Sequence, residues 1–177
     1  MNTSLYQLSV PIFLKGLGNL SQIIYKAQDY SRQNNIDELF LTHFRLYPNM
    51  FNFIAQVQFA SDFPKRFLAR LTDSKIPNDE DNESSFKDLI LRLTNSINYI
   101  KCFSPEQINS KEQKLIITNF AGKEVEHKCI DFLLEFTLPN MYFHISTAYN
   151  ILRHNGLDIG KNDYLKYEKI SYVFEKK

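Results

Sequence analysis

His144 has the side chain in this sequence best suited to acid–base chemistry near neutral pH. It shares a helical stripe with other residues spaced three or four positions apart, which lie on one face of a helix: Leu134, Thr137, Met141, Ala148 and Ile151. The ring is therefore predicted to face the interior of a helical bundle, where burial should lower its pKa. Two interpretations remain open: a neutral core histidine with a hydrogen-bond partner, or a general base or remnant metal ligand at the floor of a pocket.

Asp62 and Tyr149 are the other two candidates for catalysis. Asp62 lies one helical turn after Gln58, on the flank opposite the main apolar stripe of its helix. That position predicts a solvated carboxylate. The alternative is that Asp62 lines the bundle interior together with Tyr149.

Arg45 and Arg153 could clamp an anionic ligand, because a guanidinium group matches the geometry of a carboxylate. Each could equally tie a loop to a helix carbonyl. Together with His144 and Gln58, these two arginines form the predicted ligand-binding set.

The remaining histidines and the two cysteines have structural interpretations. His154 falls in the last turn of a predicted helix, where a cation complements the negative helix end. His127 is predicted to be exposed in a hairpin. His43 is predicted to lie between the first two helices near Arg45, either at the surface or at the rim of a pocket. Cys102 follows the third predicted helix. Cys129 begins the fourth, where a helix N-terminus can lower the pKa of a thiol, but the sequence pairs no base with it.

The sequence lacks the short motifs of common metal and nucleophile sites. None of the four histidines forms an HxxxH or HxxE pattern, and there is no GxSxG, glycine-rich phosphate loop or CxxC. We therefore predict no metal and no cofactor. The motifs leave open whether the protein is an enzyme.

The composition predicts one globular domain over residues 1–177, with a net charge of +1 and 44% hydrophobic residues. Its basic residues are scattered, so no nucleic-acid-binding surface is predicted. No segment has the ~20 apolar residues of a membrane span, and the N-terminus lacks the basic region and cleavage site of a signal peptide. We expect a cytoplasmic protein with reduced thiols and no membrane partner.

Two helices are predicted in the first half of the chain. Residues 10–27 carry apolar side chains at alternating steps of three and four, with Ser9 as the cap and Pro11 in the first turn. The second helix is predicted over Phe51–Leu71. A kink is expected at Pro64, because proline lacks the backbone N–H and its ring clashes with the preceding turn.

The third predicted helix begins after Ser85, which Asp88 completes into a pair resembling a capping box, and continues to about Ile100. An acidic run precedes it at residues 78–83. This run could be an acidic binding site, but we interpret it as a solvated linker whose charge suits the positive end of the helix.

The fourth helix is predicted over about Cys129–His154, with Gly156 as a left-handed C-cap. Before it, Lys114–Lys128 alternates apolar and polar residues around an Ala121-Gly122 turn, which predicts a short β-hairpin. The order of elements predicts an all-α fold, an antiparallel four-helix bundle with this hairpin between helices three and four. The tail is predicted to pack back onto the bundle through its aromatic residues Tyr164, Tyr167, Tyr172 and Phe174.

Four segments carry a resemblance to a known family: LYQLSVPIFLKGLGNL at Leu5–Leu20, RLYPNMFNFIAQVQFASD at Arg45–Asp62, LPNMYFHISTAYNILRHNG at Leu138–Gly156 and IGKNDYL at Ile159–Leu165. Together they resemble a bacterial domain-of-unknown-function family within the DinB/YfiT-like superfamily. The resemblance implies a DinB-like bundle of up-down-down-up topology that is commonly dimeric, and it implies no established activity.

Other branches of that superfamily are metal-dependent and include thiol-using transferases and isomerases. The resemblance implies, for those branches, one histidine on the second helix and two histidines four residues apart on the fourth. Here His144 is followed four residues later by Ala148, and Phe51–Leu71 contains no histidine. The three-histidine site is incomplete, so we do not transfer it to this chain.

Two functional hypotheses follow. In the first, the protein binds a small molecule in a pocket near His144 and could be an enzyme. In the second, it is a non-catalytic homodimeric module, since an aromatic-rich chain with little net charge has little repulsion against association. A pocket that joins His144 to a second polar group would favour the first hypothesis, and a filled bundle centre the second.

Overall fold

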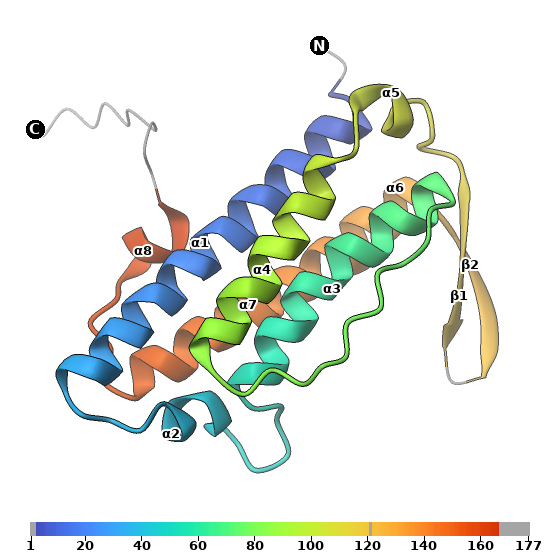
Figure 1. The fold of residues 1–177 in the computed structure, drawn as a ribbon. Helices are drawn as coiled ribbons and strands as arrows, with labels where there is room; N and C mark the ends of the chain where they lie inside the picture. Colours follow the sequence, from blue (N-terminus) through green and yellow to red (C-terminus); the bar gives the residue numbers. More distant parts are fainter. Residues whose placement is uncertain (1–2, 121, 167–177) are drawn as a thin grey trace, which may run out of the picture.

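The computed structural model describes residues 3–120 and 122–166. Four long helices dominate it, and shorter elements lie in the connections (Figure 1). The long helices are α1 (Leu5–Gln33), α3 (Phe53–Thr72), α4 (Phe86–Lys101) and α7 (Leu138–His154). The shorter elements are α2 (Glu38–His43), α5 (Pro105–Ile108), β1 (Leu115–Phe120), β2 (Lys123–Lys128), α6 (Cys129–Asp131), the π-helical segment η1 (Phe132–Thr137) and α8 (Lys161–Leu165).

The four long helices form the expected bundle. Helix α3 packs chiefly against α7 and α4, and α1 packs chiefly against α4. Figure 1 shows α3 and α4 running in the same direction, with the connection between them returning along the bundle, while α1 and α7 run in the opposite direction. This is the up-down-down-up order. The all-α prediction, with a hairpin between the third and fourth long helices, is confirmed.

Aromatic rings fill much of the core. Phe13 of α1 meets Phe67 of α3 edge to face at 5.9 Å, and Phe53 of α3 meets Phe86 of α4 in the same way at 5.9 Å. All four side chains are fully buried. Edge-to-face pairs add to burial because the positive edge of one ring meets the negative face of the other.

The helix boundaries follow their capping residues. Helix α1 begins at Leu5 because Ser4 and Gln7 form a capping box, so the prediction that Ser9 caps it was wrong. Ser9 instead lies within the helix and donates its hydroxyl hydrogen bond to the carbonyl of Leu5. For α4, the box formed by Ser85 and Asp88 is confirmed.

Proline occurs inside two of the long helices. Pro11 lies within α1 rather than in its first turn, because the helix begins earlier than predicted. Helix α3 is assigned without interruption through Pro64. The expected kink at Pro64 therefore stays a prediction.

The hairpin β1–β2 is confirmed. Its strands are antiparallel, with Leu115 opposite Lys128 at the open end and Phe120 opposite Lys123 next to the turn. Hydrophobicity alone does not tell which side chains of the hairpin are buried. Ile116 is buried, whereas Leu115 and Ile117 are about half exposed. Because side chains alternate across a strand, Thr118 lies on the buried face with Ile116.

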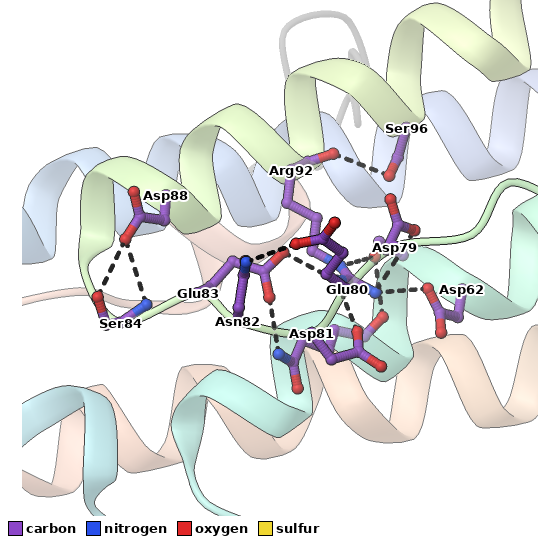
Figure 2. Close-up of polar contacts among 12 residues, drawn as sticks. Asp62, Asp79, Glu80, Asp81, Asn82, Glu83, Ser84, Asp88, Arg92 and Ser96 are labelled. Carbon is purple, nitrogen blue, oxygen red and sulfur yellow. Dashed lines mark hydrogen bonds and ion pairs between the residues drawn. The ribbon is translucent and has the colours of Figure 1, made fainter.

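The connection between α3 and α4 is attached to the bundle through part of its acidic run. The interpretation as a solvated linker was wrong for Asp79 and Glu83, which are half-buried, whereas Glu80 and Asp81 are exposed. Arg92 of α4 forms ion pairs with four carboxylates, and these contacts can be followed in Figure 2. Its guanidinium lies 2.7 Å from Asp62, 2.8 Å from Asp81, 2.8 Å from Glu83 and 3.6 Å from Asp79. The side chain of Arg92 is only 2% exposed, so these carboxylates satisfy a charge that would be costly to bury alone.

The end of the chain packs as predicted as far as it is described. Tyr164 of α8 contacts Tyr149 ring to ring at 5.8 Å, and its hydroxyl lies 2.9 Å from that of Ser146. Asn19 of α1 donates to the carbonyl of Tyr164 at 2.9 Å. The other aromatic residues of the predicted tail contact, Tyr167, Tyr172 and Phe174, lie outside the described residues.

Candidate functional site

A cleft of about 550 Å³ opens between the hairpin, the second half of α3 and η1. Cavities that bind small molecules typically measure roughly 300–1,000 Å³ and combine apolar walls with a few polar groups. We call this space the hairpin cleft. Its walls carry Phe63, Arg66, Arg70, Thr118, Asn119, Val125, His127, Phe132, Phe136 and Thr137.

The apolar wall of the hairpin cleft comes from three phenylalanines. Phe132 and Phe136 of η1 stack at 4.9 Å with an angle of 19° between their planes. Phe63 of α3 meets Phe136 edge to face at 5.6 Å. A flat or aliphatic ligand body would therefore find an aromatic surface supplied by two elements at once.

Thr137 is the least expected group in the cleft wall. It is 1% exposed, and its hydroxyl has no hydrogen-bond partner among the described residues. Threonines elsewhere in the bundle bond the carbonyl four residues earlier, as Thr147 does to Phe143 at 2.8 Å. In η1 the backbone bond runs five residues back, from the N–H of Leu138 to the carbonyl of Leu133. The hydroxyl of Thr137 therefore lacks its usual carbonyl acceptor where the hydrogen bonding changes from π-helical to α-helical.

Two arginines form the charged wall of the cleft, one helical turn apart on α3. Arg66 donates to Asp62 at 3.0 Å. Among the described residues, Arg70 forms no ion pair and its guanidinium donates no hydrogen bond. Burial, and then the like charge of Arg66, lower the pKa of Arg70. Positive charge at this wall is therefore only partly compensated.

The hairpin supplies the remaining polar groups. Nε2 of His127 lies 3.1 Å from the hydroxyl of Thr118, and the imidazole packs 5.2 Å from the ring of Phe132. His127 is half-buried, so the prediction that it is exposed was wrong. The alternation of the strands places Thr118, Val125 and His127 on the face that lines the cleft. This arrangement orients an imidazole toward the cleft.

His144 lies behind the cleft wall. Its Nδ1 is 2.7 Å from Oε1 of Gln56, and its ring stacks on Phe59 at 5.1 Å and on Phe63 at 5.7 Å. Burial lowers its pKa to about 4, in the direction predicted from the sequence. His144 does not line the cleft itself, but Phe63 contacts both.

Gln58 and Asp62 belong to the Arg92 cluster. The amide of Gln58 donates to Glu83 at 2.7 Å. Asp62 is 8% exposed and accepts from Arg92 at 2.7 Å, so the prediction of a solvated carboxylate was wrong. The reason is the arginine on the neighbouring helix, which the flank position on α3 does not reveal. The structure does not bring these two side chains together with His144.

The other predicted site residues are attached to loops. Arg45 is exposed and its guanidinium donates to the carbonyl of Pro48 at 3.5 Å. Arg153 donates to Asp158 at 2.9 Å and to the carbonyl of Leu157 at 3.3 Å, which matches the loop-tying alternative. The hydroxyl of Tyr149 donates to the carbonyl of Ile159 at 3.3 Å. None of these contacts joins the predicted set at one point.

The remaining histidines and cysteines keep structural positions. His43 is exposed and its Nδ1 lies 3.2 Å from the carbonyl of Leu39. His154 is exposed in the last turn of α7 and packs against Phe44. Cys102 is exposed. Cys129 is buried, and burial and then Glu112 raise the pKa of its thiol to about 12 against the opposing charges of two lysines.

No group of three or more His, Cys, Asp or Glu side chains within residues 3–120 and 122–166 is arranged to hold a metal ion. The predictions of no metal and no cofactor stay predictions. Within the same residues, no helix combines the length and the hydropathy that crossing a bilayer requires.

Sequence reasoning missed the cleft and the partner of His144. Phe132 and Phe136 are spaced by four residues, as are Arg66 and Arg70, so each pair was readable as one helix face. Nothing local places those faces opposite a hairpin. The one signal for η1 is Pro139, which lacks the N–H that would bond the carbonyl of Glu135.

Comparisons with known proteins agree with the fold. A family described as a domain of unknown function (DUF1993) matches residues 5–165. The chain is also similar to a crystal structure described as a DinB family member protein from Shewanella denitrificans. The two are 36% identical over 95% of this chain and 94% of that one, with a TM-score of 0.83. No curated protein sequence matches significantly.

Proposed function

The chain belongs to the DUF1993 family and has a DinB-like fold, and we propose that it binds a small organic molecule in the hairpin cleft. The observation that carries this proposal is the hydroxyl of Thr137, which is enclosed without a partner among the described residues at the wall of a 550 Å³ cleft. A buried polar group without a partner costs roughly 1–3 kcal/mol. A ligand that bonds it would recover that energy.

The surroundings of the cleft support the same function. Its walls come from α3, η1 and the hairpin, so three separate segments would hold a ligand from different sides. The aromatic rings of Phe63 and Phe136 are already in contact with each other. A wall that is packed before the ligand arrives loses little side-chain entropy on binding.

The position of His144 fits this proposal in an indirect way. Its imidazole stacks on Phe63, which lines the cleft, and its hydrogen bond to Gln56 holds the ring in place. We assign His144 the role of supporting the aromatic wall. The ligand itself would meet Phe63, not the histidine.

A cleft-filling substitution tests the proposal. Val125 of β2 faces the cleft, so Val125→Trp should fill part of it. Ile117 of β1 faces the opposite side and is 55% exposed, which makes Ile117→Trp a matched control on the same hairpin. Small organic molecules that raise the melting temperature should lose at least about tenfold in affinity in Val125→Trp and keep it in Ile117→Trp. Equal binding to both variants would exclude the hairpin cleft.

A second candidate function is self-association, which two exposed rings favour. Phe51 is 56% exposed and Phe143 is 57% exposed, and both belong to one aromatic cluster around Phe59 and His144. Exposed aromatic clusters are typical of interfaces. In this second proposal the protein is a homodimer that pairs through the Phe51–Phe143 face.

Light scattering tests the dimer. Phe143→Glu should convert a dimer into a monomer, because two buried charges would meet across a two-fold interface. Leu91→Glu is the control, since Leu91 is 59% exposed on α4, a helix that contributes neither ring. A wild-type monomer of 20.9 kDa at every concentration would rule out this function.

A further inference from the structure

The charged wall of the hairpin cleft contains a half-buried arginine with no carboxylate partner among the described residues. Arg92, the most deeply buried guanidinium, is surrounded by carboxylates, and Arg66 and Arg153 each have one. Arg70 is half-buried at the cleft wall, and no described carboxylate lies within ion-pair distance of it. A half-buried guanidinium is poorly hydrated, so an anion brought to it gains more than at an exposed arginine such as Arg45.

The other lining residues favour an anion over a cation. None of the described residues that line the cleft is acidic. Aromatic rings can attract cations through their negative faces, but Arg66 and Arg70 repel a cation from the same walls. Because Arg66 is paired with Asp62, this repulsion comes mainly from Arg70, which has no carboxylate within ion-pair distance among the described residues.

Polar and apolar groups are divided within the cleft. The stacked rings of Phe132 and Phe136 form the apolar side, while the guanidinium of Arg70 provides donors in a planar fork. The hydroxyl of Thr137, next to Phe136 in the chain, adds a donor that the protein does not use. The cleft therefore combines a surface for a flat apolar body with donors for a negative group.

From this arrangement, and on the premise that the hairpin cleft is a ligand site as proposed above, we infer that the ligand is a small organic anion. Its carboxylate or sulfonate group meets Arg70, and its apolar body packs on Phe132 and Phe136. The hydroxyl of Thr137, which is closed off before the ligand binds, donates to a polar atom of the same molecule after a small shift of the cleft wall. The inference goes beyond ligand binding because it names the chemical class and the residue that selects it.

Two fluorescent probes of nearly the same shape test the inference. Anilinonaphthalene sulfonate is an anion, and N-phenylnaphthylamine has the same ring system without the sulfonate. The wild-type protein should bind the anion about tenfold more tightly than the neutral probe. Arg70→Gln should remove this preference, because it should weaken binding of the anionic probe and not binding of the neutral one. Arg45→Gln should behave as the wild type, because Arg45 lies outside the cleft.

Further measurements keep the result readable. In the wild type, added salt should weaken binding of the anionic probe and leave binding of the neutral probe unchanged. This test does not depend on whether a variant folds. Val125→Trp should weaken both probes. The anion inference is wrong if the wild type binds both probes equally, or if Arg70→Gln keeps the preference for the anion. In either case, weaker binding of both probes to Val125→Trp would still support the hairpin cleft as a ligand site. If neither probe binds, or if Val125→Trp changes neither, the proposed function fails and the inference fails with it.

Discussion

Nδ1 of His144 lies 2.7 Å from Oε1 of Gln56, and this contact joins α7 to α3 inside the bundle. The amide of Gln56 is oriented by a second bond, from its Nε2 to the carbonyl of Phe51 at 3.1 Å. Because the amide oxygen can only accept, Nδ1 of His144 must donate. The neutral imidazole therefore carries its proton on Nδ1.

The low pKa of His144 predicts a loss of stability in mild acid. Its pKa is lowered from 6.5 to about 4 by burial, so the unfolded state binds more protons between these two values. The contribution of the neutral ring is fully present above pH 6.5 and is lost as pH falls toward 4. Each pH unit in that window should cost up to about 1.4 kcal/mol of unfolding free energy.

Urea denaturation of the wild type and His144→Phe at several pH values checks this. All other ionisable side chains are the same in both proteins, so the difference between the two unfolding free energies isolates His144. The difference should change across the window in the direction given by the lowered pKa. A constant difference from pH 7 to pH 4 would show that His144 does not titrate as a buried group.

The Arg92 cluster predicts that the connection between α3 and α4 is held by charge. Arg92→Met removes the guanidinium that Asp62 and Glu83 share. Breaking buried ion pairs in this way costs up to about 3–5 kcal/mol, and Lys65 and Arg66, which also pair with Asp62, reduce that cost. Arg153→Met is the control, because its pair with Asp158 is exposed and should contribute at most about 1 kcal/mol. Urea denaturation measures both.

Limited proteolysis gives a second readout for the same cluster. In Arg92→Met the segment 73–85 should be cut faster than in the wild type, because its carboxylates no longer attach it to α4. Equal cutting of the wild type and Arg92→Met would mean that Lys65, which pairs with Asp62 and Asp79, is sufficient to hold the segment.

Much of the fold was predictable because it depends on local signals. The capping box of Ser85 and Asp88 and the left-handed Gly156, at φ +91°, are set by a few neighbouring residues. The hairpin was readable from its alternation and its turn. The start of α1 was missed because Ser4 and Ser9 are both capping residue types, and the choice of Ser4 depends on Gln7 three positions later.

The candidate site was less predictable because it depends on partners far apart in sequence. Asp62 is separated from Arg92 by 30 positions, and His144 from Gln56 by 88. Periodicity places a side chain on a helix face, but it does not say which side chain faces it. The hairpin cleft has the same origin, since α3, β2 and η1 meet there only after the bundle has formed.

The two cysteines predict a simple difference in reactivity. Cys102 is exposed, whereas Cys129 is buried and the pKa of its thiol is raised to about 12 by burial first and by Glu112 second. The thiolate is the reactive form, so the native protein should react once with a thiol reagent at neutral pH. Cys102→Ser should show no fast reaction, and Cys129→Ser should react as the wild type. Fast labelling of Cys129 in the folded protein would contradict its burial.

Thr137 and Thr147 allow the proposed ligand site to be separated from general packing. Both are buried threonines of the same continuous helical stretch, but Thr147 donates to the carbonyl of Phe143 and Thr137 has no partner among the described residues. Valine has nearly the same shape as threonine without the hydroxyl. Thr147→Val should therefore lose about 1 kcal/mol of unfolding free energy, while Thr137→Val should be neutral or more stable by up to about 1 kcal/mol. Of the two variants, only Thr137→Val should weaken the binding of anilinonaphthalene sulfonate, by severalfold. If Thr137→Val destabilises the protein as much as Thr147→Val and leaves probe binding unchanged, the hydroxyl serves packing, and the cleft loses its donor.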